Sequence, residues 1–270
     1  MVVQHNLTAA NANRQLGITT NAQQKSTEKL SSGYRINRAS DDAAGLSISE
    51  KMRSQIRGLD QASTNAEDGI SAVNVAEGAL NEAHDILQRM NELATQAAND
   101  TNTSVDRTAI KAEIDQLVSE IDRIQSTTQF NTMNLLDGTF TGKNLQVGSL
   151  AGQTIGISIA NMDAATLGVN SLDVSSNSAA GTSMTAIQSA IEKVSTQRSK
   201  LGAITNRLEH TVKNLDTTSE NTSAAESRIR DVDMAEEMVT YSKNSILMQA
   251  GQSMLAQANQ QNQGVLSLLQ

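Results

Sequence analysis

Apolar residues recur at steps of three or four along most of this chain, the spacing that places side chains on one face of a helix. The longest such stripe runs from Ile48 to Ala97, and its average step of about 3.5 residues is the period of a left-handed coiled coil. It predicts one helix from about Ala43 to Asn99. A helix of this length cannot bury its apolar stripe within itself, so it needs partner helices.

Two further stripes supply those partners. One runs from Ile110 to Ile124 after the polar break Asn99–Thr103, and Thr103 and Asp106 have the spacing of a capping box at a helix start. The other begins near Met184 and continues to Leu215. The simplest arrangement is an antiparallel bundle, in which the second helix folds back on the first and the third joins them.

The pattern changes between about Phe130 and Ser183, where glycines separate short runs. Asn144–Val147 and Thr154–Ile159 are typical of small strands, with a turn at Leu150–Gln153. This region predicts a small β excursion from the helical bundle, at about residues 130–183. Ser171–Ser183 is rich in Ser, Ala and Asn and predicts a loop.

Both ends of the chain are helical in pattern and nearly free of charge. Arg14 is the only charged residue between Met1 and Gln24, and none occurs from Asn244 to Gln270, where Gln and Asn alternate with Met and Leu. Because charge keeps surfaces soluble and separate from their copies, uncharged amphipathic ends indicate surfaces that are buried against other chains. Neither end carries enough apolar surface to offset the entropy of ordering. We therefore expect both to be largely disordered in the free subunit and to fold on association.

Composition excludes several classes of function. The net charge of −8 argues against general nucleic-acid binding, which needs clustered Lys and Arg. No apolar run approaches a membrane span, and no basic stretch followed by an apolar one marks a cleavable signal peptide. The three histidines, His5, His84 and His210, are far apart and form no His-Glu-x-x-His motif. We expect no catalytic residue, no cofactor and no metal site.

Several segments resemble the signature of bacterial flagellins. The first is Leu30–Leu46, which reads LSSGYRINRASDDAAGL, and the other segments follow it in the family's order. The resemblance covers roughly residues 1–140 and 185–270, and the middle is shorter than in many flagellins, which implies a short form without large outer variable domains. The remaining segments are Asp68–Ser71, Ala76–Leu80, Thr128–Asn131, Ala225–Asp233 and Ala256–Gln261.

The resemblance implies a mainly α fold, a long-helix coiled-coil bundle with a small β excursion. Residues 1–43 and 231–270 would pair as a coiled coil lining the filament's inner tube, and residues 44–230 would form the outer helical bundle. The chain would be a structural subunit, not an enzyme, that polymerises into the extracellular filament used for motility. Its implied partners are other subunits, an export chaperone, and hook-associated and filament-cap proteins, with export that needs no cleaved signal peptide. The alternatives are a hook–filament junction protein and a secreted ligand whose chief role is receptor binding.

Gly33–Ala44 would be the spoke between the two layers of the filament. It holds a dense patch of mixed charge formed by Arg35, Arg38, Asp41 and Asp42. These charges either pair across subunits and help to select a packing state, or belong to a solvated turn before an Asp-rich helix start.

Packing in the inner tube is expected of an apolar set at the two ends. The methionines of the set favour packing, because Met tolerates small changes of neighbour. The last apolar residues also match the end that flagellins present to the export chaperone and to intracellular sensors. The set consists of Leu7, Met248, Met254, Leu255, Val265, Leu266, Leu268 and Leu269.

A third candidate surface lies on the longest predicted helix. Gln88, Arg89 and Leu93, with Glu113 on the next helix, are similar to the flagellin surface recognised by Toll-like receptor 5. Their one-to-four spacing allows the first three to share a face. The alternative is an ordinary helix stripe, and Asn91 departs from the arginine that some family members have there.

Overall fold

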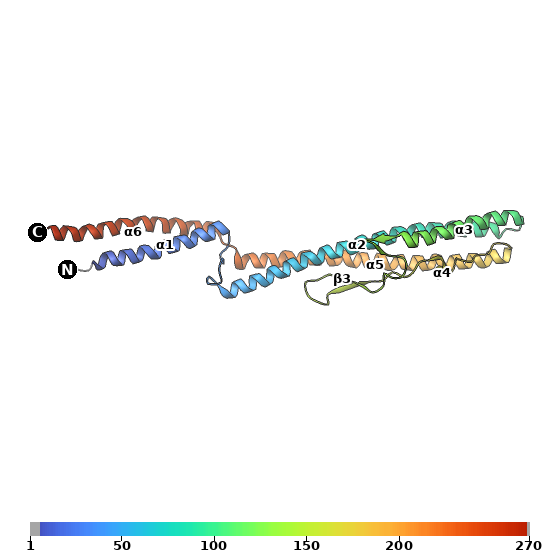
Figure 1. Ribbon diagram of the computed structural model, residues 1–270, viewed down its shortest axis with the longest axis horizontal. Coiled ribbons are helices and arrows are strands. Elements are labelled where there is room, and N and C mark those ends of the chain that lie inside the picture. Colours follow the sequence, from blue (N-terminus) through green and yellow to red (C-terminus); the bar gives the residue numbers. More distant parts are fainter. Residues whose placement is uncertain (1–5, 269–270) are drawn as a thin grey trace. The chain divides into compact units, whose positions relative to one another are not determined.

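The structure is a computed structural model that describes the backbone of residues 6–268 and the side chains of residues 6–261 (Figure 1). The chain divides into two compact units, with Gln55–Glu220 as one unit and residues 6–54 with 221–268 as the other. These divisions fall inside the long helices α2 (Ala43–Ala97) and α5 (Asn177–Arg230). Domain boundaries were expected at 43/44 and 230/231, close to the ends of the same helices.

The Gln55–Glu220 unit is built on α2 and α5, which run antiparallel. Ser63 Oγ donates a hydrogen bond to Asp216 Oδ1 at 3.0 Å, and Glu77 lies 3.9 Å from Arg198 further along the pair. The helix α3 (Ser104–Thr127) folds back on α2, so the predicted antiparallel bundle is confirmed. Its core is a continuous apolar cluster that includes Leu80, Leu87, Met90, Ile114, Ile121, Ile187, Val194 and Leu201.

The start of α3 is fixed by the predicted capping box. The Thr103 hydroxyl accepts from Asp106 N at 3.3 Å, and the Asp106 carboxylate accepts from Thr103 N at 2.9 Å. Each side chain satisfies a backbone donor that the first turn of a helix leaves without a partner.

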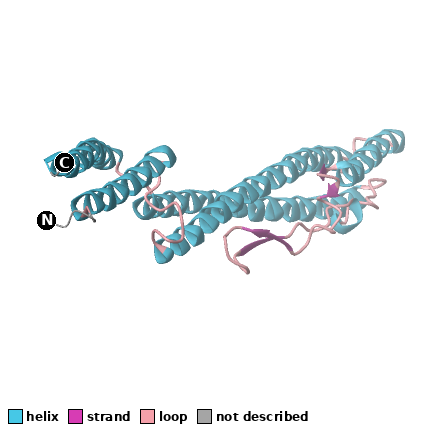
Figure 2. Cartoon of the chain, turned by 60° about the vertical axis from the view of Figure 1, so that its left-hand side comes forward, coloured by secondary structure: helices cyan, strands magenta, loops and turns pink. Residues whose placement is uncertain are grey.

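Two small antiparallel sheets follow α3, and they are the magenta elements of Figure 2. The strands β3 (Lys143–Gln146) and β4 (Thr154–Ile157) form the predicted hairpin, with Leu145 opposite Ile155. The second strand is shorter than expected, because it ends at Ile157. Leu145 and Ile155 turn toward the helices and pack in the cluster around Ala66 and Leu208.

Three features of this middle region were not predicted. The strands β1 (Gln129–Phe130) and β2 (Met133–Asn134) form a second hairpin, and α4 (Ala164–Leu167) is a single helical turn. The expected loop Ser171–Ser183 is wrong in its second half, because α5 begins at Asn177. Burial of Ala180 and Ser183 against the bundle holds this polar turn in a helix.

The other unit contains α1 (Leu7–Ser32) and α6 (Met234–Leu268) with the adjoining ends of α2 and α5. Asn6 caps the start of α1, and Gly33 ends the helix in the left-handed region at φ 76°. Arg35 N donates to Arg230 O at 2.7 Å and Val232 N to Gly33 O at 3.1 Å, which ties the two connecting segments together. The predicted terminal helices are thus present and lie side by side.

Candidate assembly surface

The seam between α1 and α6 combines small and polar residues with a few apolar side chains that are only partly buried. Leu16 reaches Gly251, where a Cβ would lie 3.3 Å from Leu16 Cδ1, and Asn6 Nδ2 donates to Ala258 O at 3.0 Å. Of the side chains described on the two helices, only Ser26 and Ala258 are buried. The pair therefore has almost no apolar core of its own.

The apolar side chains of this pair lie mostly on its outside. Val239 is 70% exposed and Ile246 is 66% exposed, at positions seven residues apart on the face of α6 that turns away from the seam. Exposed apolar side chains of this kind do not stabilise an isolated chain, whereas burying them against another chain stabilises the complex. The exposed apolar side chains of this pair are Leu7, Ile18, Met234, Met238, Val239, Ile246, Leu247 and Met254.

The expected inner-tube set divides between these two faces. Met248 and Leu255 are partly buried and lie on the seam, while Leu7 and Met254 are exposed. Val239 and Ile246 were not among the expected residues, although their seven-residue spacing on α6 was a signal that could have identified them. Val265, Leu266, Leu268 and Leu269 belong to the expected set but lie outside the described side chains.

The two arginines of the expected spoke make contacts within their own chain. Arg35 Nη2 donates to Ile229 O at 2.6 Å, and Arg38 Nε donates to Glu28 Oε1 at 2.9 Å. Arg38 is nevertheless largely exposed, so its guanidinium keeps donors free for a further acceptor. Next to them the Arg230 guanidinium lies 4.4 Å from the centre of the Tyr34 ring.

The two aspartates of the segment organise its backbone. Asp41 Oδ2 accepts from Arg38 N at 3.0 Å and from Asn37 N at 3.3 Å, and Asp42 Oδ1 accepts from Gly45 N at 2.9 Å in the first turn of α2. The donated N–H of Arg38 is the main reason that the pKa of Asp41 lies below its ordinary value. This geometry supports the local alternative, a turn before a capped helix, for both aspartates.

The expected receptor surface is only partly assembled at the outside of the bundle. Arg89 Nη2 lies 2.9 Å from Glu113 Oε1 and joins α2 to α3, and Gln88 lies beside His84 on α2. Leu93 does not share this face, because it is 2% exposed and packs in the core. One-to-four spacing put Leu93 near Arg89 along the helix, but the apolar stripe of α2 turns it inward.

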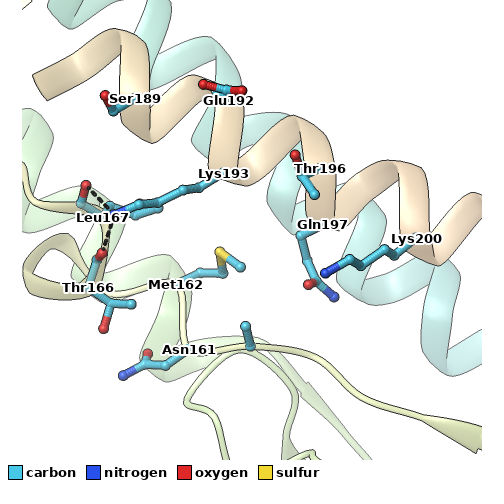
Figure 3. A pocket seen from close by; sticks show the side chains of 11 residues that line it. Asn161, Met162, Thr166, Leu167, Ser189, Glu192, Lys193, Thr196, Gln197 and Lys200 are labelled. Carbon is cyan, nitrogen blue, oxygen red and sulfur yellow. Dashed lines mark hydrogen bonds between the residues drawn. The ribbon is translucent and has the colours of Figure 1, made fainter. Parts of the chain in front are cut away.

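Two grooves lie along the β side of α5. The first, of about 500 Å³, lies between α5 and the segment that leads into α4, and Figure 3 shows Lys193 and Lys200 reaching into it. Lys193 Nζ donates to Thr166 O at 2.8 Å and to Leu167 O at 3.2 Å. The second, of about 470 Å³, lies beside the tip of the β3–β4 hairpin and is lined by Arg207. Neither groove has a nucleophile paired with a base.

Within residues 6–268, no three His, Cys, Asp or Glu side chains are placed to hold one metal ion. None of the helices in that range combines the length and the hydropathy that a membrane crossing needs.

Comparison with known proteins identifies relatives over the whole chain. The family profiles for the bacterial flagellin N-terminal and C-terminal helical regions match residues 3–141 and 184–269. The flagellin of Halalkalibacterium halodurans is 56% identical over 271 residues, and that of Bacillus subtilis is 51% identical over 304 residues, each covering 100% of both chains. The crystal structure of Bacillus cereus flagellin matches with a TM-score of 0.52 and 32% identity, over 60% of this chain and 94% of that one.

Proposed function

Because the chain belongs to the bacterial flagellin family and is a subunit of the flagellar filament, we propose that the helix pair α1 and α6 is the surface through which it polymerises. The observation that carries the proposal is the uncovered apolar surface of this pair, on a part of the chain almost without charge. Full burial of one Ile or Met side chain stabilises by about 1.5–3 kcal/mol. Several such side chains in every subunit are enough to drive association.

The proposal assigns a different place in the filament to each part of the chain. Residues 1–43 and 231–270 would form the inner tube and residues 44–230 the outer layer, with the segment 33–44 between the two. In that segment Arg35 and Arg38 are the groups proposed to meet a neighbouring subunit. Asp41 and Asp42 already accept hydrogen bonds from their own backbone and would set the shape of the turn.

Coupled folding and association is the proposed mechanism. The terminal helices bury only two of their described side chains, so their pairing offsets little of the entropy lost on ordering. Contacts with neighbouring subunits would supply the rest. An export chaperone before assembly, and hook-associated and cap proteins at the filament ends, are the partners proposed for the same surface.

A hook–filament junction role is not favoured, because the full-length relatives are named flagellins. Recognition by Toll-like receptor 5 is proposed for the exposed part of its expected surface, namely Gln88, Arg89 and Glu113. In the filament the same residues would be available only where neighbouring subunits leave them uncovered.

The direct test removes residues 242–270 and seeds polymerisation at near-neutral pH, with electron microscopy as the readout. We expect a soluble helical subunit that forms no filaments, whereas the intact chain forms long ones. Straight filaments from the truncated chain would refute the role of α6.

A point variant sharpens this test. Ile246→Glu places a charge on the exposed apolar face of α6, and Gln252→Glu places the same charge on an exposed polar position on another side of the same helix. We expect Ile246→Glu to raise the critical concentration by about 100-fold, since it loses apolar burial and buries a charge. The Gln252→Glu control should change the critical concentration much less. Equal effects would mean that net charge, and not this face, controls assembly.

A further inference from the structure

A row of cations runs along the β side of α5 and has no acidic partner. Lys193, Lys200 and Arg207 follow at intervals of seven residues, so they repeat about every 10 Å along the helix. All three are exposed, and none forms an ion pair with any of the residues described, 6–261. Lys193 donates to the carbonyl oxygens of Thr166 and Leu167, which orient its ammonium group without neutralising it.

The row lies in the two grooves described above. Lys193 and Lys200 line the first groove, with Met162 and Leu167 on the opposite wall (Figure 3). Arg207 lines the second groove. A hollow of this kind lets a partner's side chain approach the cations from the solvent side and lose part of its water, which strengthens the attraction between opposite charges.

The complementary surface is on α2 of the same chain. Its outward positions carry acidic side chains that are exposed and that also form no ion pair in the described part of the chain. The whole helix segment 57–92 has an excess of acidic residues, while the α5 segment 192–213 has an excess of basic ones. The exposed acidic residues of this segment without an ion pair are Asp60, Glu67, Asp68, Glu82 and Asp85, and among them Asp60 accepts a hydrogen bond from Ser219 Oγ at 2.7 Å.

The two charged surfaces lie at the same level of the bundle. The Glu77–Arg198 contact, at 3.9 Å, sits within both segments and fixes how α2 and α5 pass each other. Two copies placed side by side in the same orientation would therefore bring the acidic surface of one to the height of the basic row of the other. No other partner is needed to explain why each subunit carries both.

We infer that the Lys193–Lys200–Arg207 row binds the acidic α2 surface of a neighbouring copy and sets the lateral register of two subunits. This inference rests on the proposed function, since it requires polymerisation, but it concerns a surface separate from α1 and α6. Exposed charge pairs contribute little each. Repeated in every subunit of a polymer, they steer encounter and disfavour shifted registers that place like charges together.

The test compares two substitutions that change net charge equally. Lys200→Glu reverses a charge in the row, and Lys213→Glu reverses an exposed charge on α5 outside it. At low ionic strength we expect Lys200→Glu to raise the critical concentration for polymerisation by about tenfold and Lys213→Glu to have little effect. At about 1 M salt, where the screening length is about 3 Å, the difference should disappear.

A charge exchange completes the test. The variant that combines Lys200→Glu and Arg207→Glu should polymerise poorly, and adding Glu67→Lys and Asp68→Lys, which lie level with Arg207, to the same chain should restore polymerisation. The inference is overturned if Lys200→Glu and Lys213→Glu have equal critical concentrations, or if the exchanged variant does not recover. In either case, filament formation by the wild-type chain would still support the proposed function. If the wild-type chain fails to polymerise from seeds, both fall.

Discussion

Two glycines on α2, Gly69 and Gly78, should respond in opposite directions to the same substitution. Gly58, Gly69 and Gly78 all lie inside this helix, where alanine is more favourable than glycine by about 1 kcal/mol. Around Gly78 no atom lies within 4 Å of an added Cβ, so Gly78→Ala should raise the free energy of unfolding by nearly that amount.

At Gly69 the gain in helix propensity is opposed by a collision. An added Cβ would lie 2.1 Å from Leu145 Cδ1 and 3.5 Å from Leu208 Cδ1. Leu145 belongs to β3 and packs in the cluster that holds the hairpin on the helices. To make room it must leave its rotamer or move the hairpin, and overpacking of this kind costs about 1–3 kcal/mol. We therefore expect Gly69→Ala to lower the free energy of unfolding by about 1 kcal/mol, which places it about 2 kcal/mol below that of Gly78→Ala.

The assay is urea unfolding of the monomer followed by circular dichroism at low protein concentration, with the midpoint compared at constant slope. A double variant identifies the cause. In a Leu145→Ala background the collision is gone, so Gly69→Ala should stabilise as Gly78→Ala does. The reasoning fails if Gly69→Ala stabilises the wild-type chain as much as Gly78→Ala, or if its effect is the same with Leu145 and with Ala at that position.

Three other outcomes follow from single features. Thr103→Ala should destabilise by about 1 kcal/mol in urea unfolding, because it removes the cap of α3. The Thr103 hydroxyl is the main cause of the lowered pKa of Asp106. The stability that this carboxylate contributes is therefore present above its unfolded pKa near 3.8 and is lost as pH falls through the lower folded pKa. In Thr103→Ala the free energy of unfolding should consequently fall less steeply with decreasing pH on the acid side. Thr132→Gly should raise the free energy of unfolding by about 1 kcal/mol, measured by thermal unfolding. Thr132 has a φ of 64° in the β1–β2 turn, a conformation that glycine adopts without steric cost. Hydrogen exchange should be fast in α1 and α6 of the dilute monomer and slow in filaments, and strong protection in the monomer would contradict folding on association.

Long periodic stripes made most of the helices predictable, and tertiary contacts explain where prediction failed. The stripe of α2 and the capping box of α3 are local signals, and both are present in the structure. The first turns of α5 have no such stripe. Ser183 is held there by a remote partner, since its hydroxyl donates to Asp173 O at 2.7 Å and accepts from Asp173 N at 3.0 Å. A contact of this kind is not encoded in spacing, so the segment read as a loop.

The β1–β2 hairpin was missed for a related reason. Both residues of its two-residue turn, Asn131 and Thr132, have positive φ, a conformation that glycine usually provides. With threonine at the second position the common turn signal is absent, and the strands on either side have two residues each. Leu135 and Leu136 are buried in the core directly after β2, and Leu135 N donates to Thr128 O at 3.1 Å, so contacts outside the turn hold the hairpin in place.

The candidate assembly surface was predictable in kind and not in detail. The missing charges at both ends pointed to α1 and α6 as the segments proposed to be buried between chains, and these helices leave large apolar side chains exposed. Which face of α6 would meet α1 could not be read from apolar spacing, because the seam closes on Gly251 and Ala258 and not on the larger Val239 and Ile246. Small residues let the two helices approach closely and leave the larger ones to the outside.

This choice of small residues links the structure of the terminal helices to their function. If Val239, Ile246 and Met254 lay in the seam, the two helices would form a stable hairpin with a polar exterior, and the subunit would have no reason to associate through them. With Gly251 and Ala258 in the seam, the pair buries little apolar surface by itself, and its exposed apolar side chains are the ones proposed to be covered by neighbouring subunits. The bundle of α2, α3 and α5, which has a dense core of its own, is stable without that contribution. If α1 and α6 are the polymerising surface, as proposed, the free energy of burying their exposed apolar side chains is released only when a filament grows.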